Sequence, residues 1–133
     1  MPARLLSAAL ACFLAASAFA QMPAAVVADG VDERPLFAVE IKTGPNWDAA
    51  KPAQEQAFFR EHSANLKRLR DAGALVMGAR YSDKGLVVLA AEDIVAVKAM
   101  MDADASVSAG TFVYEAHPFN VFYAGTVRAR PRK

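Results

Sequence analysis

One amphipathic segment organises the rest of the chain: Phe58-Phe-Arg-Glu-His62-Ser-Ala-Asn-Leu-Lys-Arg-Leu-Arg-Asp-Ala-Gly73. At helical spacing, its apolar side chains and one histidine share a face, made up of Phe59, His62, Leu66 and Leu69. The other faces are charged. His62, one of two histidines in the chain, is therefore either a satisfied core residue or a residue that looks into a pocket.

The ends of this helix are marked by proline and glycine. Pro52 is acceptable in a first helical turn, so we expect the helix to begin near it and to run to Ala72. Gly73 then stands where a left-handed C-cap belongs.

Residues 1–20 have the pattern of a cleaved signal peptide. Arg4 supplies the positive charge, an apolar run follows, and Ala18-Phe-Ala20 matches the small-x-small cleavage pattern. The apolar run is shorter than the roughly 20 residues of a membrane-spanning helix, so no stable membrane span is expected. We predict cleavage before Gln21 and a periplasmic or secreted bacterial protein. Residues 21–35 show no sustained period and indicate a linker or N-terminal arm.

Composition limits what the mature chain does. Removing residues 1–20 from 133 leaves 113, enough for one domain, and removes the single cysteine, Cys12. No disulfide, thiol nucleophile or thiolate metal site is then expected, and no cofactor, because the sequence has no glycine-rich phosphate loop. Without Arg4, 14 basic residues balance 14 acidic ones, which argues against nucleic acid as a partner.

The C-terminal tail, residues 124–133, is the local exception in charge. It ends in Arg128-Ala-Arg-Pro-Arg-Lys133. A short basic tail is most often a solvated terminus, and contact with an anionic or membrane surface is the alternative.

Four strands and a second helix are expected around the first helix. The strands are Leu36–Lys42, Ala74–Arg80, Leu86–Ala91 and Thr111–His117, with Phe119–Tyr123 a further piece beyond Pro118. Glu92-Asp93 begins a second helix, whose apolar face consists of Ile94, Val97, Met100 and Met101. The order βαββαβ predicts an α+β, ferredoxin-like domain: an antiparallel sheet with two helices on one face.

The strands carry apolar side chains on both faces, so the face without helices is not expected to meet water. Pairing two such sheets face to face would bury it. The pattern therefore predicts a homodimer built as a dimeric α/β barrel.

Two motifs resemble those of YCII-related (YciI-like) proteins. The segment from His62 to Gly73, followed by Leu75-Val-Met-Gly78, resembles that family's H-x-x-x-L-x-x-L-x-x-x-G-x-L-x-x-G pattern. Asp104-Ala-Ser-Val-Ser-Ala-Gly110 resembles its D-P-(apolar)-V-x-A-G segment. The match covers residues 36–123. The resemblance implies a dimeric α+β barrel and a His–Asp pair as the active site, which corresponds here to His62 and Asp104.

This sequence departs from the family pattern at two places. Ala105 and Ser106 replace a proline and a residue that is often aromatic or apolar. Gly78-Ala-Arg-Tyr81 stands where the family often has a Gly-Gly-Pro-like turn. The backbone near Asp104 and the shape of the pocket are therefore expected to differ.

A carboxylate beside an imidazole fixes its tautomer and suits it to carry a proton near neutral pH. His62 and Asp104 could thus catalyse proton abstraction, isomerisation or elimination. The alternative is a buried histidine that a carboxylate merely satisfies. Asp102 competes with Asp104, but lies two residues away and points to a different side of a helix.

Other side chains are candidates for ligand contacts. Arg80 and Tyr81 lie at a strand end, where they could hold an anionic or phenolic ligand, or form an ordinary exposed pair. Trp47 and Phe59 could line an apolar pocket, or simply pack in the core. A metal site joining His117 to His62 lacks a third ligand at a recognisable spacing, so no metal is expected.

Two functions follow from these observations. The first is an exported protein that binds a small organic molecule and acts on it as an acid/base isomerase or lyase. The second is a non-catalytic ligand-binding or assembly module with a structural His–Asp pair.

Overall fold

The structure, a computed structural model, describes residues 32–130. It contains a four-stranded sheet and helices in the order β1 (Leu36–Thr43), η1 (Ala53–Glu55), α1 (Phe59–Asp71), β2 (Leu75–Tyr81), β3 (Lys84–Ala90), α2 (Ile94–Asp102), α3 (Ala105–Ser108) and β4 (Phe112–Pro118). The predicted signal peptide, residues 21–31 of the predicted arm and the last three residues of the tail lie outside the described residues.

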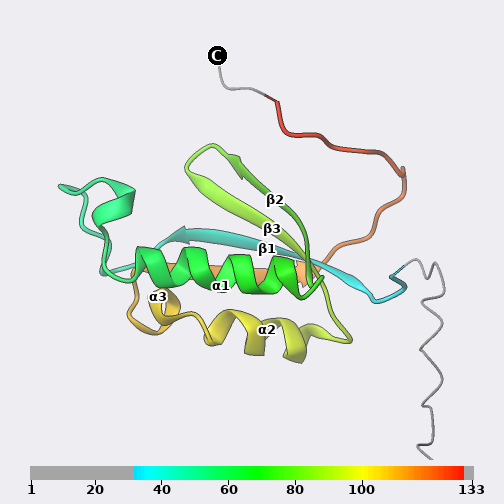
Figure 1. The fold of residues 1–133 in the computed structure, drawn as a ribbon, viewed down its shortest axis with the longest axis horizontal. Coiled ribbons are helices and arrows are strands. Elements are labelled where there is room, and N and C mark those ends of the chain that lie inside the picture. The colour runs from blue at the N-terminus through cyan, green and yellow to red at the C-terminus, as the bar shows by residue number, and fades with distance from the viewer. Residues whose placement is uncertain (1–31, 131–133) are drawn as a thin grey trace, which may run out of the picture. The chain divides into compact units, whose positions relative to one another are not determined.

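All neighbouring strands are antiparallel, in the order β2-β3-β1-β4. This order confirms the predicted α+β class and antiparallel sheet, and it is compatible with the ferredoxin-like arrangement. Figure 1 shows α1 and α2 on one side of the sheet. The buried core there includes residues of β1, β3 and both helices: Phe37, Val39, Ile41, Leu69, Val87, Leu89, Val97 and Met101.

Helix α1 ends as its sequence predicts but begins later. Gly73 has φ +71°, and its N–H donates to Arg70 O at 3.0 Å while Ala74 N donates to Leu69 O at 2.9 Å. These bonds form a Schellman cap. The expected start near Pro52 was wrong. Pro52 precedes the short 3₁₀ helix η1, and Phe58, with φ 60°, interrupts the chain before α1.

The second helical region is divided in two. Asp93 caps α2 by accepting a hydrogen bond from the N–H of Ala96 at 2.8 Å. Aspartate is among the residues preferred at this position. After α2 ends at Asp102, the short helix α3 follows, capped by Asp104. The sequence pattern did not indicate α3, because four residues are too few to show helical periodicity.

The C-terminal segment after β4 does not form the further strand expected for Phe119–Tyr123. It keeps one ladder-like bond, from Phe119 N to Leu36 O at 2.8 Å. Phe122 and Tyr123 are almost fully exposed, and Arg128 and Arg130 are also exposed.

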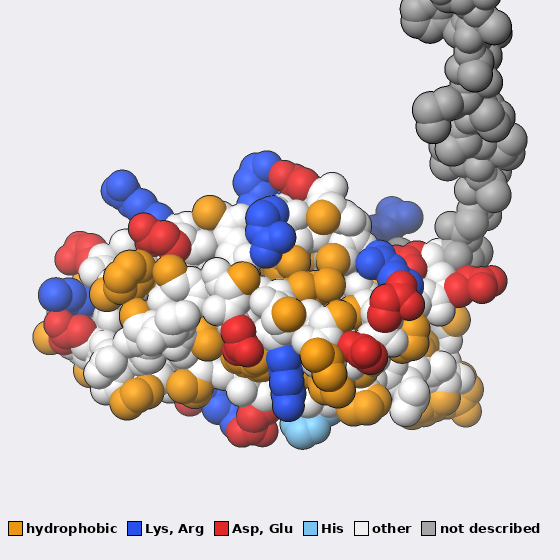
Figure 2. All heavy atoms as spheres, turned by 90° about the horizontal axis from the view of Figure 1, so that it is seen from below, with side chains coloured by type: hydrophobic (Ala, Val, Ile, Leu, Met, Phe, Trp, Pro, Cys, Tyr) orange, Lys and Arg blue, Asp and Glu red, His pale blue; other side chains and the backbone are white. Residues whose placement is uncertain are grey.

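Figure 2, which shows the molecule from below, has acidic, basic and apolar side chains mixed over its surface. Charges of opposite sign also pair on α1, where Lys67 and Asp71 form an ion pair. Among residues 32–130, no helix combines the length and the apolar character needed to cross a membrane.

Candidate functional site

A pocket of about 710 Å³ opens at one end of the sheet. The η1 loop, the start of α1 and the tip of the β2–β3 hairpin lie at this end (Figure 1). The pocket is lined mostly by apolar and aromatic side chains, including Ile41, Trp47, Phe59, Leu66, Val87 and Phe112, together with His62 and Arg80. Its volume is typical of a site for a small organic molecule. Four of the six residues predicted from the sequence as site residues, namely Trp47, Phe59, His62 and Arg80, therefore line one pocket.

His62 lines this pocket from the buried side of α1. The residue is 8% exposed. Its ring lies against Phe112, with 4.6 Å between the ring centroids and 38° between the planes. Phe112 in turn contacts Trp47, at 5.4 Å. Aromatic packing thus fixes the plane of the imidazole.

Asp104 holds the other side of the imidazole. Its carboxylate is fully buried, and Oδ2 lies 2.7 Å from Nδ1 of His62. Oδ1 accepts the N–H of Ser106 at 2.9 Å and the hydroxyl of Ser106 at 2.6 Å. Burial raises the pKa of Asp104, but the hydrogen bonds from His62 and Ser106 outweigh it, so its pKa lies below the ordinary value. The pair is therefore built around an ionised Asp104.

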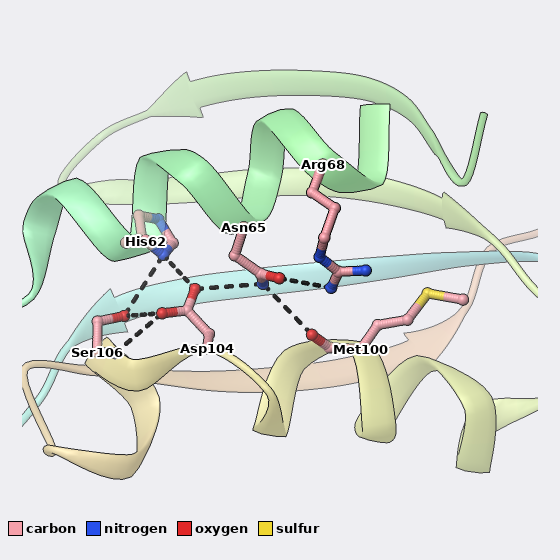
Figure 3. Close-up of polar contacts among 6 residues, drawn as sticks. All are labelled: His62, Asn65, Arg68, Met100, Asp104 and Ser106. Carbon is pink, nitrogen blue, oxygen red and sulfur yellow. Dashed lines mark hydrogen bonds and ion pairs between the residues drawn. The ribbon is translucent and has the colours of Figure 1, made fainter. Parts of the chain in front are cut away.

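Two further residues of α1 extend this network (Figure 3). Nδ2 of Asn65 lies 3.5 Å from Oδ2 of Asp104 and 3.3 Å from Met100 O. Arg68 donates to Oδ1 of Asn65 at 2.7 Å. Sequence reasoning missed both residues. The available signal was their spacing: His62, Asn65 and Arg68 recur every three residues, which puts them on one side of a helix.

The tautomer of His62 follows from this geometry. An ionised carboxylate only accepts hydrogen bonds, so the hydrogen shared with Asp104 lies on Nδ1. Nε2 is then the basic nitrogen. Among the described residues, Nε2 of His62 has no hydrogen-bond partner. Thr111 Oγ1 is the one fully buried side-chain polar atom there that lacks a partner, so Nε2 is not fully buried. The basic nitrogen is therefore accessible from the pocket that His62 lines.

Tyr81 lies outside the pocket, unlike its neighbour Arg80. Successive strand residues point to opposite faces, so the two cannot both face the helices. The Tyr81 hydroxyl donates to Glu40 on the helix-free face, where Lys42 and Lys84 also pair with Glu40 at 2.9 and 3.3 Å. Tyr81 as a ligand contact is thus corrected to a member of a surface network.

Asp102 and His117 are also separate from the pair. Asp102 accepts the hydroxyl of Tyr114 at 2.8 Å, and burial together with this bond raises the pKa of Tyr114 to about 12. His117 stands opposite Ala38 in the sheet and lies 3.7 Å from Glu115, on the face without helices. Within residues 32–130, no three side chains of the types that bind metals gather at one point.

Ser106 completes a serine–histidine–aspartate set in composition but not in geometry. In a nucleophilic triad, serine and aspartate bind opposite ring nitrogens. Here Ser106 Oγ lies 3.5 Å from Nδ1, the nitrogen that Asp104 already occupies, and Ser106 is fully buried. Its hydroxyl is thus a partner of Asp104 and not a nucleophile.

No protein-family model, no curated protein and no solved structure matches this chain. The α+β sheet and the buried His62–Asp104 pair at an aromatic pocket therefore carry the functional argument.

Proposed function

We propose that this chain is an exported, YCII-like protein that binds a small organic molecule and acts on it by acid/base chemistry of the isomerase or lyase type. One observation carries the proposal: Asp104 holds Nδ1 of His62 at 2.7 Å, which leaves Nε2 as the basic nitrogen on an aromatic pocket. Export rests on the pattern of residues 1–20, and the family on the two motifs around His62 and Asp104.

The chemistry follows from the tautomer. Nε2 takes a proton from an acidic C–H or O–H of the bound molecule, and the electron pair left behind shifts within that molecule. The imidazolium is stabilised by the charge of Asp104. In an isomerisation the same proton returns to another atom of the molecule; in an elimination it leaves with the departing group. Neither route needs a covalent intermediate.

The proposal includes a homodimer formed through the helix-free face of the sheet. This face carries partly buried apolar side chains, Leu36, Ala38, Met77 and Leu86, which a second sheet would cover. It also carries the network of Glu40, Lys42 and Glu115, in which Glu40 stands beside Leu86 in the sheet. Light scattering of residues 21–133 should give twice the monomer mass, and a monomer at micromolar concentration would refute the dimer.

One observation favours the non-catalytic alternative. Asp104 is also the N-cap of α3, so its conformation has a structural use independent of any reaction. In a binding or assembly module, His62 would satisfy this carboxylate and no proton would move.

The test separates binding from proton transfer. A library of small cyclic compounds is screened against residues 21–133 by thermal shift, and each hit is incubated with the protein in D₂O. We expect His62→Gln to keep the fold but to abolish exchange of a carbon-bound ligand hydrogen for deuterium, as followed by NMR. His117→Gln is the matched control, because it alters an exposed histidine on the other face.

Each outcome has a distinct meaning. Hits that bind without any hydrogen exchange would refute the acid/base reaction and support the non-catalytic binding module. Unfolding of both His62→Gln and Asp104→Asn would assign the pair a structural role.

A further inference from the structure

Two glycines face the pocket from the β2–β3 hairpin: Gly78 in the interior of β2, and Gly85 as the second residue of β3. Gly78 on β2 stands opposite Val87, and Gly85 on β3 stands opposite Arg80 and the buried Ile41. All these positions lie on the helix side of the sheet, and both glycines line the pocket. Glycine in a strand interior weakens the strand and often marks a place that something else approaches closely.

Backbone conformation does not explain these glycines. Neither has the positive φ that Gly73 and Gly110 have. A Cβ at Gly85 would meet Ile41 Cβ at 3.6 Å, and one at Gly78 would meet nothing closer than 4.0 Å, both ordinary contacts. The protein itself has room for side chains here. What they would take is space in the pocket, so the two glycines keep a flat stretch of sheet open.

The walls around this stretch are aromatic and apolar. Trp47 and Phe112 pack with a tilt of 49°, and Phe59 and Leu66 of α1 also line the pocket. Aromatic walls and a flat sheet surface favour a flat molecule, which gains contact area on both of its faces.

Arg80 adds an unpartnered positive charge. It lies on the pocket side of β2 and, among the described residues, makes no ion pair. The other charges at the pocket are Lys42, which pairs with Glu40 and Glu115, and Asp83, in the hairpin turn. A guanidinium with free donors binds a carboxylate through two parallel hydrogen bonds. Asp83, in contrast, repels a ligand carboxylate. Arg80 stands opposite Gly85 in the sheet, so its Cα lies beside the flat stretch formed by the two glycines.

We propose that the pocket selects a flat, ring-containing organic anion, such as an aromatic carboxylate, which lies over Gly78 and Gly85 and is held by Arg80. This inference rests on the proposed small-molecule site and names its ligand class. In this pose one edge of the ring system meets Arg80 and the molecule lies within the same pocket as His62.

Three probes separate shape from charge: 2-naphthoate is flat and anionic, 2-naphthalenemethanol is flat and neutral, and adamantane-1-carboxylate is anionic and round. Titration calorimetry on residues 21–133 should give at least about tenfold tighter binding for 2-naphthoate than for the other two. Arg80→Gln should remove the preference for 2-naphthoate over the neutral probe. Lys84→Gln, a charge change on the same hairpin, should leave it intact, because Lys84 pairs with Glu40 on the other face.

The glycines are tested by graded filling. Gly85→Ala and Gly85→Val, with the matching pair at Gly78, should weaken 2-naphthoate binding in order of size while the melting temperature is retained. Retained melting distinguishes a filled pocket from an unfolded strand. Where a valine variant unfolds, the alanine variant still gives the answer.

The outcomes are decisive. Equal affinities for the three probes, no measurable binding of 2-naphthoate, or unchanged binding in the alanine and valine variants would each overturn the ligand class. None of these results touches the acid/base proposal, which depends on hydrogen exchange at His62 with whatever compound binds.

Discussion

Arg68 fixes which end of the Asn65 amide faces the buried carboxylate. Its Nη2 donates to Oδ1 of Asn65 at 2.7 Å. A guanidinium is only a donor, so it must meet the amide oxygen, and the amide NH₂ is then turned towards Asp104. A surface cation is thus linked, through one amide, to the anion that orients His62.

Replacing that amide by a carboxylate should unsettle the site. Asn65→Asp places a second acidic group about where Nδ2 now faces Asp104. Two neighbouring buried carboxylates repel one another when both are ionised. We expect a loss of about 1–3 kcal/mol in the free energy of unfolding at pH 7, partly recovered at pH 5. Urea titrations at both pH values measure this. Asn120→Asp, at an exposed position, is the control, and an equal loss there would show that the network has no special role.

Asp104 should contribute pH-dependent stability at the acidic end. Its pKa is lower in the folded protein than the ordinary value near 3.8, so the unfolded chain binds its proton more readily. The contribution is complete above the unfolded-state pKa and is lost as pH falls through the lower folded-state pKa. The difference in unfolding free energy between the wild type and Asp104→Asn should therefore shrink below about pH 4. A difference that stays constant from pH 7 to pH 2 would contradict an ionised Asp104.

Ser106 should support the same carboxylate. Ser106→Ala removes the 2.6 Å bond to Oδ1 but keeps the backbone N–H bond. We expect a loss of about 1–2 kcal/mol in unfolding free energy, because a charged acceptor in a buried site loses a donor. Ser108→Ala, on the exposed side of α3, is the matched control and should change little. Equal effects of the two substitutions would mean that α3 propensity, and not Asp104, is being measured.

Gly73 should be needed for its backbone conformation alone. Its φ is +71°, and a Cβ there would have no neighbour within 4 Å. Gly73→Ala should therefore cost about 1 kcal/mol through left-handed strain without a steric clash. Gly125→Ala, equally free of neighbours but without positive φ, should cost close to nothing. Thermal unfolding of the two variants gives the comparison.

The sequence predicted the sheet and its helices, because hydrophobic period and the glycine that ends α1 are local signals. The pairing of His62 with Asp104 was expected only from the resemblance to YCII-related proteins, because no local pattern links residues so far apart in the chain. The sequence did not predict the other partners of Asp104. Ser106 was noted as a departure from the family motif, yet only the turn into α3 shows that its hydroxyl binds the carboxylate. Asn65 and Arg68 were absent from the predicted site because polar residues on a helix are usually exposed, and Asn65 is buried only through contacts with α2 and α3.

The misplacement of Tyr81 has a different origin. Strand alternation was available from the sequence, and applying it to Arg80 and Tyr81 would have assigned them to opposite faces. The late start of α1 could not be found in this way, because the positive φ of Phe58 is set by the loop it joins and not by its residue type.

The backbone amide at the cap of α3 provides a spectroscopic signal that reports on the pocket. The backbone N–H of Ser106 donates to the carboxylate that holds His62, so the two are separated by a single side chain. When a bound ligand gives a proton to the imidazole, the negative charge of Asp104 shifts towards Oδ2. The hydrogen bond from the Ser106 amide to Oδ1 then changes strength. The amide resonance and hydrogen-exchange rate of Ser106 would thus register occupancy of the pocket from a position that no ligand touches.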